Sequence, residues 1–529
     1  MKNIFKSTAL ILTSILALAS CSSTSNSSSG SSSSDNIVHV SDASASITLT
    51  SSATESINLT PDNVTISETY HTIESKRHYN TQVLPSIGDI KLLVIPVIIS
   101  GYEGISLDDD NVNDIDKVKE DINETFFGKD GDEKLGYESV SSFYEKSSYG
   151  KLRLSGTVTD WFDLSETDLG YTSASSITIS ETYKVAAAAV NWAEKSQGID
   201  MTQYDNDKDG YIDGVWLVYS APNYSNGGPR NDDNNFWAYT TWGNQTTAGN
   251  VEDPIYNLFG WASYDFMYEG YGKKSLDAHT YIHETGHFLG LSDYYSDASA
   301  YNPIGKVDMM DANIVDHNSY SKMLLGWTKP YIVRGNKTIE LGAMANENSF
   351  IVIPSDDMTI TNGEFDPFGE YILIELYTNE GLNYKDSRVA LSDRSLAMNS
   401  KGIRIYHIDS RKYLADVSDT SNITCTEYKG ETLSKTKRII LPISNNRGSD
   451  TYNNIFKFDT TFNLFDEIRL FESNGKNTFS NGGYQKSTSL FDKGDSFSLA
   501  TYGKDFFLNQ TTFDNGSAFT STITIGDIK

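Results

Sequence analysis

Two histidines four residues apart impose the strictest geometric condition in this sequence. They belong to the spacing His283-Glu284-x-x-His287-x-x-Gly290-x-x-Asp293. Residues four apart share one face of an α-helix, so both imidazoles can bind the same metal ion. Gly290 tolerates the left-handed backbone that is needed where a helix ends and the chain turns back. We therefore predict a helix, a glycine turn, and a zinc ion bound by His283, His287 and Asp293.

Glu284 lies next to this metal-binding face and is not one of the predicted ligands. Its carboxylate can accept a proton from a metal-bound water as the water attacks a carbonyl carbon, and can then donate that proton to the leaving amine. Zinc favours this reaction because it acidifies the water and polarises the carbonyl. The pattern thus predicts hydrolysis of peptide bonds with Glu284 as the general base. The alternative is a buried helix whose histidines are only hydrogen-bonded.

The third ligand distinguishes two kinds of zinc protease. In one kind, a glutamate on a later helix is the third zinc ligand. No Glu occurs between Glu284 and Glu340, so this chain lacks that ligand. The spacing instead resembles that of the metzincins, with Asp293 in place of the more usual third histidine. Metzincins also carry a methionine in a turn beneath the metal. The run Val307-Asp308-Met309-Met310-Asp311 lies at a suitable distance, and we favour Met310 for this position.

A narrower resemblance is to the immune inhibitor A-like metalloproteases of bacteria. It rests on residues 139–158, residues 205–220, the zinc helix with residues 292–295, and residues 321–327. These stretches cover about residues 90–330, and weaker similarity continues at 370–382 and 402–409. The resemblance implies a secreted protease with a metzincin-like catalytic domain, structural calcium and downstream β domains.

An acidic loop follows the pattern of a calcium site. Its oxygen ligands have the spacing of an EF-hand-type loop, with Gly210 at the bend: Asp205, Asp207, Asp209, the Tyr211 carbonyl and Asp213. Position twelve is Trp216 and a strand-like stretch follows it, so we predict a calcium loop that is not an EF-hand. The alternative is a solvated acidic turn.

The N-terminus predicts export and lipid attachment. Residues 1–20 combine a charged start with an apolar run too short to span a bilayer, as in a signal peptide. The run ends in Leu-Ala-Ser-Cys21, which resembles the lipobox of bacterial lipoproteins; secretion without a lipid is the alternative. Residues 21–36 are rich in serine and suit a flexible tether. We therefore expect a bacterial cell-surface protein that contacts the membrane only through its lipid anchor.

Charge and cysteine content exclude other classes. The formal net charge is −29 at pH 7, which argues against a nucleic-acid partner. The cysteines are Cys21 and Cys425, so a lipid on Cys21 leaves no intramolecular disulfide.

The remaining pattern predicts an α+β protein. Residues 37–88 are either an N-terminal β segment or a propeptide. Residues 89–330 form a zincin catalytic domain that contains a buried strand at 91–99 and helices at 114–127 and 182–195. Residues 331–529 read as an all-β, sandwich-like region.

These features together predict a secreted, lipid-anchored zinc endopeptidase with zinc and structural calcium. Its substrates would be extracellular proteins or glycoproteins. A surface adhesin or glycan-binding lipoprotein that retains a metzincin scaffold is the alternative. His279, one turn before His283, is expected to support the site rather than bind the metal. His317 and Tyr320 are weaker candidates for stabilising an oxyanion.

Overall fold

The computed structural model describes most of the chain from residue 42 onward. The described residues are 42–53, 55–78, 82–107, 113–230, 235–243, 248–271, 274–296, 301–346, 349–391, 394–441, 456–458, 466–507 and 510–529. The predicted signal peptide, Cys21 and the tether lie outside this set. Within it, no helix combines the length and the apolarity that crossing a membrane requires.

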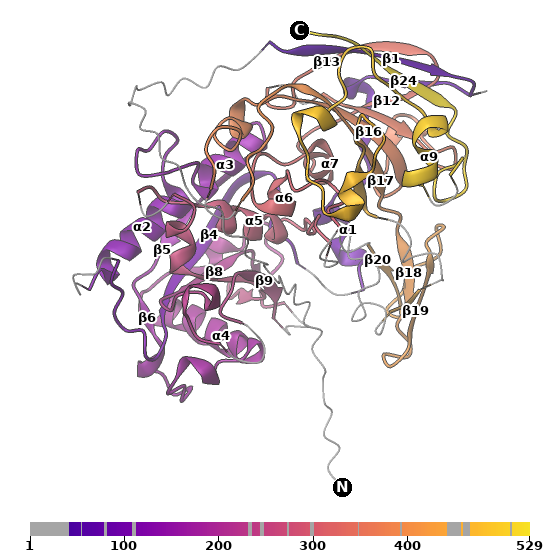
Figure 1. Ribbon diagram of the computed structural model, residues 1–529. Coiled ribbons are helices and arrows are strands. Elements are labelled where there is room, and N and C mark those ends of the chain that lie inside the picture. The colour runs from indigo at the N-terminus through magenta and orange to yellow at the C-terminus, as the bar shows by residue number, and fades with distance from the viewer. Residues whose placement is uncertain are drawn as a thin grey trace, which may run out of the picture.

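Most of the strands between residues 88 and 263 form a mixed sheet at the centre of the first part of the molecule (Figure 1). Its order is β5 (Leu152–Val158), β4 (Gly88–Ile98), β8 (Val215–Tyr219), β11 (Leu258–Ser263) and β9 (Tyr239–Trp242), and β6 (Phe162–Asp163) also pairs with β4. Neighbouring strands are parallel except β9, which runs antiparallel to β11. A short parallel pair, β7 (Tyr211–Ile212) with β10 (Ile255–Tyr256), lies outside this sheet.

Helices cover both faces of this sheet because its central strands are apolar on both sides. Leu92 and Val94 of β4 share a core with α2 (Ile115–Phe127), α3 (Val140–Ser147) and α5 (His279–Phe288). Leu93 and Ile95 point to the other face and pack against α4 (Ile179–Lys195). Burial on both faces explains the uninterrupted apolar run of this strand. The predicted strand and both predicted helices are confirmed.

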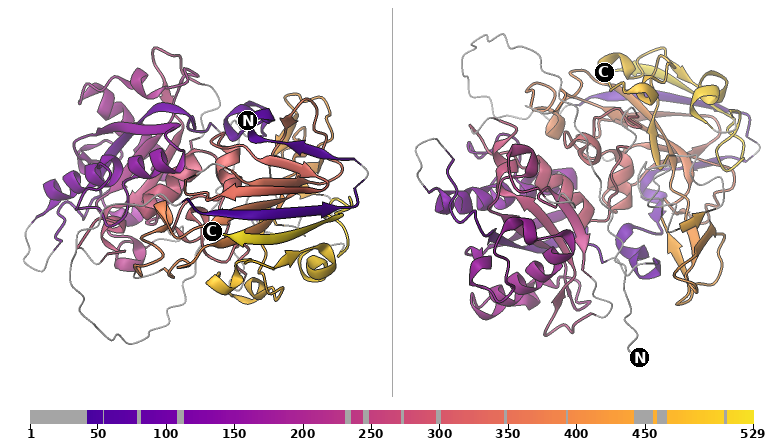
Figure 2. Two further views of the ribbon diagram at one scale, coloured as in Figure 1. Left: turned by 90° about the horizontal axis from the view of Figure 1, so that it is seen from above. Right: turned by 60° about the horizontal axis from the view of Figure 1, so that its bottom comes forward.

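The N-terminal strands complete sheets that the C-terminal region builds. β1 (Ser44–Ser51) lies between β13 (Lys337–Gly342) and β24 (Ser521–Ile528), antiparallel to both. In Figure 2 the indigo strand β1 lies beside the yellow C-terminal strand. Two shorter strands, β2 (Ile57–Leu59) and β3 (Thr65–Ile66), pair with β12 (Tyr331–Arg334) and β15 (Glu364–Phe365). The first described segment is thus an integral part of the β region.

Two of the C-terminal sheets face each other across one core. The first is β13-β1-β24-β23 (Ser496–Phe497), and the second is β2-β12-β14 (Ile351–Pro354)-β16 (Glu370–Tyr377)-β17 (Gly402–Asp409)-β22 (Ile468–Leu470). Ile47 and Ile523 of the first sheet share a hydrophobic core with Ile372 and Ile405 of the second.

A third sheet and a helix extend this β region. The sheet has the order β20 (Lys437–Ile440), β18 (Tyr413–Asp416), β19 (Ile423–Glu427) and β21 (Phe456–Phe458). The helix is α9 (Leu499–Phe506), which packs Tyr502 and Phe506 into the core between the two facing sheets. The expectation of an all-β region is therefore corrected, because a helix covers part of this core. The protein as a whole is α+β.

Candidate metal centre

Helix α5 ends where the glycine was expected. Leu289 caps the helix, and Gly290 follows with φ of +97°, a conformation that side chains with a Cβ rarely adopt. The Gly290 amide donates to the His287 carbonyl at 2.9 Å, and the Tyr294 amide donates to the Met310 carbonyl at 2.7 Å. The turn therefore brings the segment after α5 back across the helix, next to the methionine turn.

Three predicted ligands converge on one point. The Nε2 atoms of His283 and His287 lie 3.1 Å and 3.2 Å from the same atom, Oδ1 of Asp293. Ligand atoms bound tetrahedrally at about 2.0 to 2.1 Å from an ion lie about 3.3 to 3.4 Å apart, so the spacing fits zinc. Apart from these two imidazole nitrogens, Asp293 Oδ1 is buried without a hydrogen-bond partner among the described residues. The residues present therefore fit a divalent metal ion.

Backbone carbonyls orient both imidazoles. Nδ1 of His283 lies 2.8 Å from the Met309 carbonyl, and Nδ1 of His287 lies 2.8 Å from the Leu291 carbonyl. A carbonyl can only accept, so in the neutral ring the proton is on Nδ1 and the lone pair is on Nε2. Each histidine thus presents its ligand nitrogen toward Asp293.

Glu284 is placed beside these ligands. A carboxylate oxygen of Glu284 and a ring nitrogen of each histidine lie within 4.8 Å of one another. Burial raises the pKa of Glu284, and the nearby charges of His287 and His283 act in the opposite direction. Its Oε2 atom is buried without a hydrogen bond to any described residue. This oxygen therefore keeps a free acceptor position next to the three predicted ligands.

Met309 and Met310 both contact α5. Asp308 caps the short helix α6 (Met309–Ala312) by accepting from the Met310 amide at 2.9 Å. A Cβ added to Gly286 would lie 2.5 Å from Sδ of Met310, so this side chain packs directly against the helix between the two histidines. Met309 contributes its carbonyl to His283 instead. Met310 therefore contacts α5 between the two histidines, and its assignment to a metzincin-type methionine turn stays a prediction.

The acidic loop brings three of its four aspartates together. Carboxylate oxygens of Asp205, Asp207 and Asp209 lie within 4.8 Å of one another. Asp213 is fully buried, and its Oδ2 accepts from the backbone and side chain of Asn206 at 2.6 and 2.7 Å. Its Oδ1 has no hydrogen-bond partner within the described chain. The Tyr211 amide donates to Asp209 Oδ1 at 2.8 Å, and Tyr211 itself lies in β7.

The pKa values in this loop reflect crowded carboxylates. Burial, together with repulsion from Asp207 and Asp205, raises the pKa of Asp209 to about 6. Burial and the charges of Asp207 and Asp209 raise the pKa of Asp213 to about 8. A bound cation would relieve both effects because it favours the charged carboxylates.

A buried charge network supports the start of α5. His279 Nδ1 lies 2.6 Å from Asp277 Oδ1, its Nε2 lies 3.3 Å from Asp386 Oδ2, and its ring stacks on Tyr137 at 4.2 Å. Arg394 approaches Asp277 at 3.5 Å. The sequence suggested a supporting role for His279. It gave no signal for Asp386, which is 107 residues away.

This network predicts that stability depends on pH. Burial lowers the pKa of His279, but Asp386 and Asp277 outweigh burial and raise it from 6.5 to about 9. Protonated His279 therefore stabilises the fold fully below about pH 6.5, and this contribution is lost as the pH rises to about 9. We expect the free energy of unfolding in urea to fall over this range for the wild type, and to fall less for His279→Gln. Equal slopes for the two proteins would contradict the assignment.

The N-terminal segment contacts the turn that carries Asp293. Tyr70 is buried in α1 (Tyr70–Ile73), and its Cβ and Cγ would both lie 2.9 Å from a Cβ added to Gly290. A side chain at Gly290 would meet two obstacles, the positive φ and the Tyr70 ring.

Gly290→Ala is therefore expected to reduce stability by about 2 to 4 kcal/mol, which combines backbone strain with overpacking. Gly227→Ala is the matched control, because Gly227 has φ of +85° but nothing within 4 Å of an added Cβ. The control should lose only about 1 kcal/mol. Urea unfolding measures both values, and equal losses would show that the Tyr70 contact contributes nothing.

The weaker oxyanion candidates lie inside the core. His317 is surrounded by the rings of Phe143, Tyr144 and Trp327, and burial lowers its pKa well below its usual value. The Tyr320 hydroxyl donates to Glu467 at 2.8 Å. Both side chains are buried, so neither contacts a substrate in this conformation.

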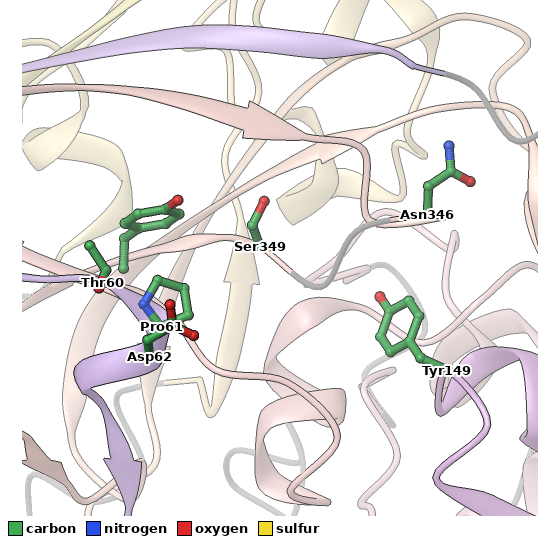
Figure 3. Close-up of a pocket in the computed structure, with 7 residues that line it drawn as sticks. Thr60, Pro61, Asp62, Tyr149, Asn346 and Ser349 are labelled. Atoms are coloured by element: carbon green, nitrogen blue, oxygen red, sulfur yellow. The ribbon is translucent and has the colours of Figure 1, made fainter.

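A surface pocket lies apart from these residues. Its lining consists of Thr60, Pro61, Asp62, Tyr149, Tyr331, Asn346 and Ser349 (Figure 3). None of the predicted zinc or calcium ligands takes part in it. We assign it no role in the chemistry.

The fold and this centre define a metallopeptidase, a hydrolase whose candidate metal ligands lie on one helix and the turn that follows it. Residues 105–314 match the family model described as immune inhibitor A peptidase M6, catalytic domain. The matched segment includes α5, Asp293 and Met310, and it confirms the resemblance to the immune inhibitor A peptidases. A search of curated protein sequences gives no match.

Proposed function

We propose that this protein is a zinc endopeptidase that cleaves extracellular proteins or glycoproteins. The observation that supports this proposal most directly is the convergence of His283, His287 and Asp293 on one point, with Glu284 beside it. In such a site, bound zinc supplies a Lewis acid and lowers the pKa of a water molecule.

The residues of the chain have distinct tasks in this proposal. His283 and His287 hold the metal through Nε2, since their Nδ1 atoms are engaged by backbone carbonyls. Asp293 adds a negative charge to the ligand set. Glu284 accepts the proton of the attacking water and transfers it to the leaving amine. The Thr240 hydroxyl of β9 donates to the Glu284 carbonyl at 2.9 Å and joins this strand to the helix.

A calcium ion in the acidic loop is part of the same proposal. Asp205, Asp207 and Asp209 offer clustered carboxylate oxygens, and Asp213 offers a buried oxygen without a hydrogen bond in the described chain. Hard oxygen ligands of this kind suit calcium. In this proposal the Tyr211 carbonyl completes the set. The ion would stabilise the loop between η5 (Met201–Tyr204) and β8.

Export and lipid attachment at Cys21 complete the proposed function. The sequence of residues 1–36 carries this part of the proposal. The serine-rich tether would hold the catalytic domain away from a bacterial membrane, where it meets extracellular proteins.

One experiment tests the proposed activity. The purified protein is analysed for metal and incubated with an unbiased peptide library. We expect zinc to co-purify, and we expect cleavage that stops when a chelator removes zinc and resumes when zinc is restored. Binding of a surface ligand without any cleavage by the zinc-loaded protein would contradict the proposal and support the adhesin.

A further inference from the structure

A third group of ligand-type side chains joins the N-terminal segment to the acidic loop. It consists of His71 on α1, Glu74 at the start of η2 (Glu74–Lys76), and Asp207. A potential ligand atom of each residue lies within 4.8 Å of those of the other two. Nε2 of His71 lies 3.7 Å from Oδ2 of Asp207.

The carboxylates of Glu74 and Asp207 are each held by a hydrogen bond to one of their two oxygens. Glu74 Oε2 accepts from the Val83 amide at 2.9 Å, and Asp207 Oδ1 accepts from the Asp209 amide at 3.2 Å. Nδ1 of His71 is buried and makes no hydrogen bond within the described residues. Each carboxylate is therefore held through one oxygen, and Nε2 of His71 faces Oδ2 of Asp207.

The charge around the group is unbalanced. In the described part of the chain, neither Glu74 nor Asp207 forms an ion pair with a lysine or arginine, although Lys76 pairs with Glu68 nearby. Burial raises the pKa of Glu74 to about 8, and repulsion from Asp207 and Asp209 adds to this effect, while the hydrogen bond from Val83 and the charge of Arg77 oppose it. A cation at this point would remove the repulsion and would draw the three ligand atoms closer together.

A similar group in the β region differs in an important way. Glu370, His407 and Asp514 also bring ligand atoms within 4.8 Å. Both oxygens of Glu370 are already used, because they accept from the amides of Asp514 and Asn515 at 2.6 and 2.8 Å. His407 adds a third contact to Glu370 at 2.8 Å. These hydrogen bonds join β16, β17 and the segment that contains Asp514, and they occupy acceptor positions that a metal ion would need.

We propose that His71, Glu74 and Asp207 form a second transition-metal site that fastens the N-terminal segment to the catalytic domain. An imidazole nitrogen with two carboxylates suits zinc and related ions, whereas calcium prefers oxygen ligands alone. Asp207 would be shared with the neighbouring calcium loop. The inference does not depend on peptide hydrolysis, because none of its residues belongs to the proposed catalytic centre.

The test counts zinc in the full exported chain. Metal-free protein is equilibrated with Zn²⁺ in the presence of excess Ca²⁺ and then analysed by mass spectrometry of the metals. We expect His71→Ala and Glu74→Gln each to bind about one zinc ion fewer than the wild type. His78→Ala, which alters another histidine of the same segment, should bind as much zinc as the wild type.

A further variant separates this site from the catalytic one. His287→Ala should lose the catalytic zinc and keep the ion at His71, so the two losses should add in the double variant His71→Ala/His287→Ala. Equal zinc binding by the wild type and His71→Ala would overturn the inference, whatever His287→Ala does. Failure of His287→Ala to lose zinc would instead contradict the proposed catalytic centre.

Discussion

Glu284→Gln is expected to lower kcat/KM for a peptide substrate by about a hundredfold to ten-thousandfold, the usual contribution of a general base. The amide has nearly the same shape as the carboxylate, but it cannot accept the proton of the attacking water. The side chain is buried, and its Oε2 atom has no hydrogen-bond partner in the described chain, so little other structure depends on its charge. Steady-state kinetics on one fluorogenic peptide measures the effect.

The same variant should keep its zinc and its fold. Neither imidazole nor Asp293 is altered, so zinc content and the thermal unfolding temperature should match those of the wild type. Glu380→Gln, which changes a glutamate remote in sequence from α5, serves as the control for the substitution itself. Retention of more than about a tenth of the wild-type activity by Glu284→Gln would contradict the assigned role.

Removal of β1 should have the largest effect on stability. A chain that begins at residue 54 lacks the strand between β13 and β24, and with it the fully buried side chains of Ala45, Ile47 and Leu49. Burial of a side chain the size of Ile or Leu contributes about 1.5 to 3 kcal/mol, and the two broken strand pairings add to that loss. The total is a large part of the roughly 5 to 15 kcal/mol that stabilises a typical domain. We expect the truncated chain to unfold or aggregate, whereas a chain that begins at residue 42 should remain folded.

Single substitutions in β1 refine this prediction. Ile47→Ala should cost about 2 to 5 kcal/mol because it leaves a cavity in the core between the two facing sheets. Thr48→Ala, on the opposite and partly exposed face, should cost much less. Circular dichroism during thermal unfolding compares the two truncated chains, which begin at residues 42 and 54, with the variants Ile47→Ala and Thr48→Ala. A stable mature enzyme that lacks β1 would contradict the integral role of this strand and would favour a propeptide.

The sequence predicted the features that depend on local spacing. Helix α5, the glycine turn and the buried strand β4 each follow from periodicity or from the backbone preference of one residue. The convergence of Asp293 with both histidines also needs only a short segment. For this reason, the sequence of residues 283–293 suffices to predict the candidate centre.

Features that join distant segments could not be predicted in this way. β1 pairs with strands that lie about 290 and 480 residues away, and nothing within an eight-residue strand specifies such partners. Asp386 reaches His279 from a loop after β16, and Tyr70 reaches Gly290 from the N-terminal segment. These contacts depend on how the β region packs against the catalytic region.

The identity and position of the metal ion test the account most directly. Crystals of the Glu284→Gln protein, grown with zinc, would be measured on both sides of the zinc absorption edge. We predict an anomalous peak at about 2.0 to 2.2 Å from Nε2 of His283, Nε2 of His287 and a carboxylate oxygen of Asp293. A fully zinc-loaded crystal with no peak at this position, or with Asp293 turned away from both imidazoles, would contradict the account.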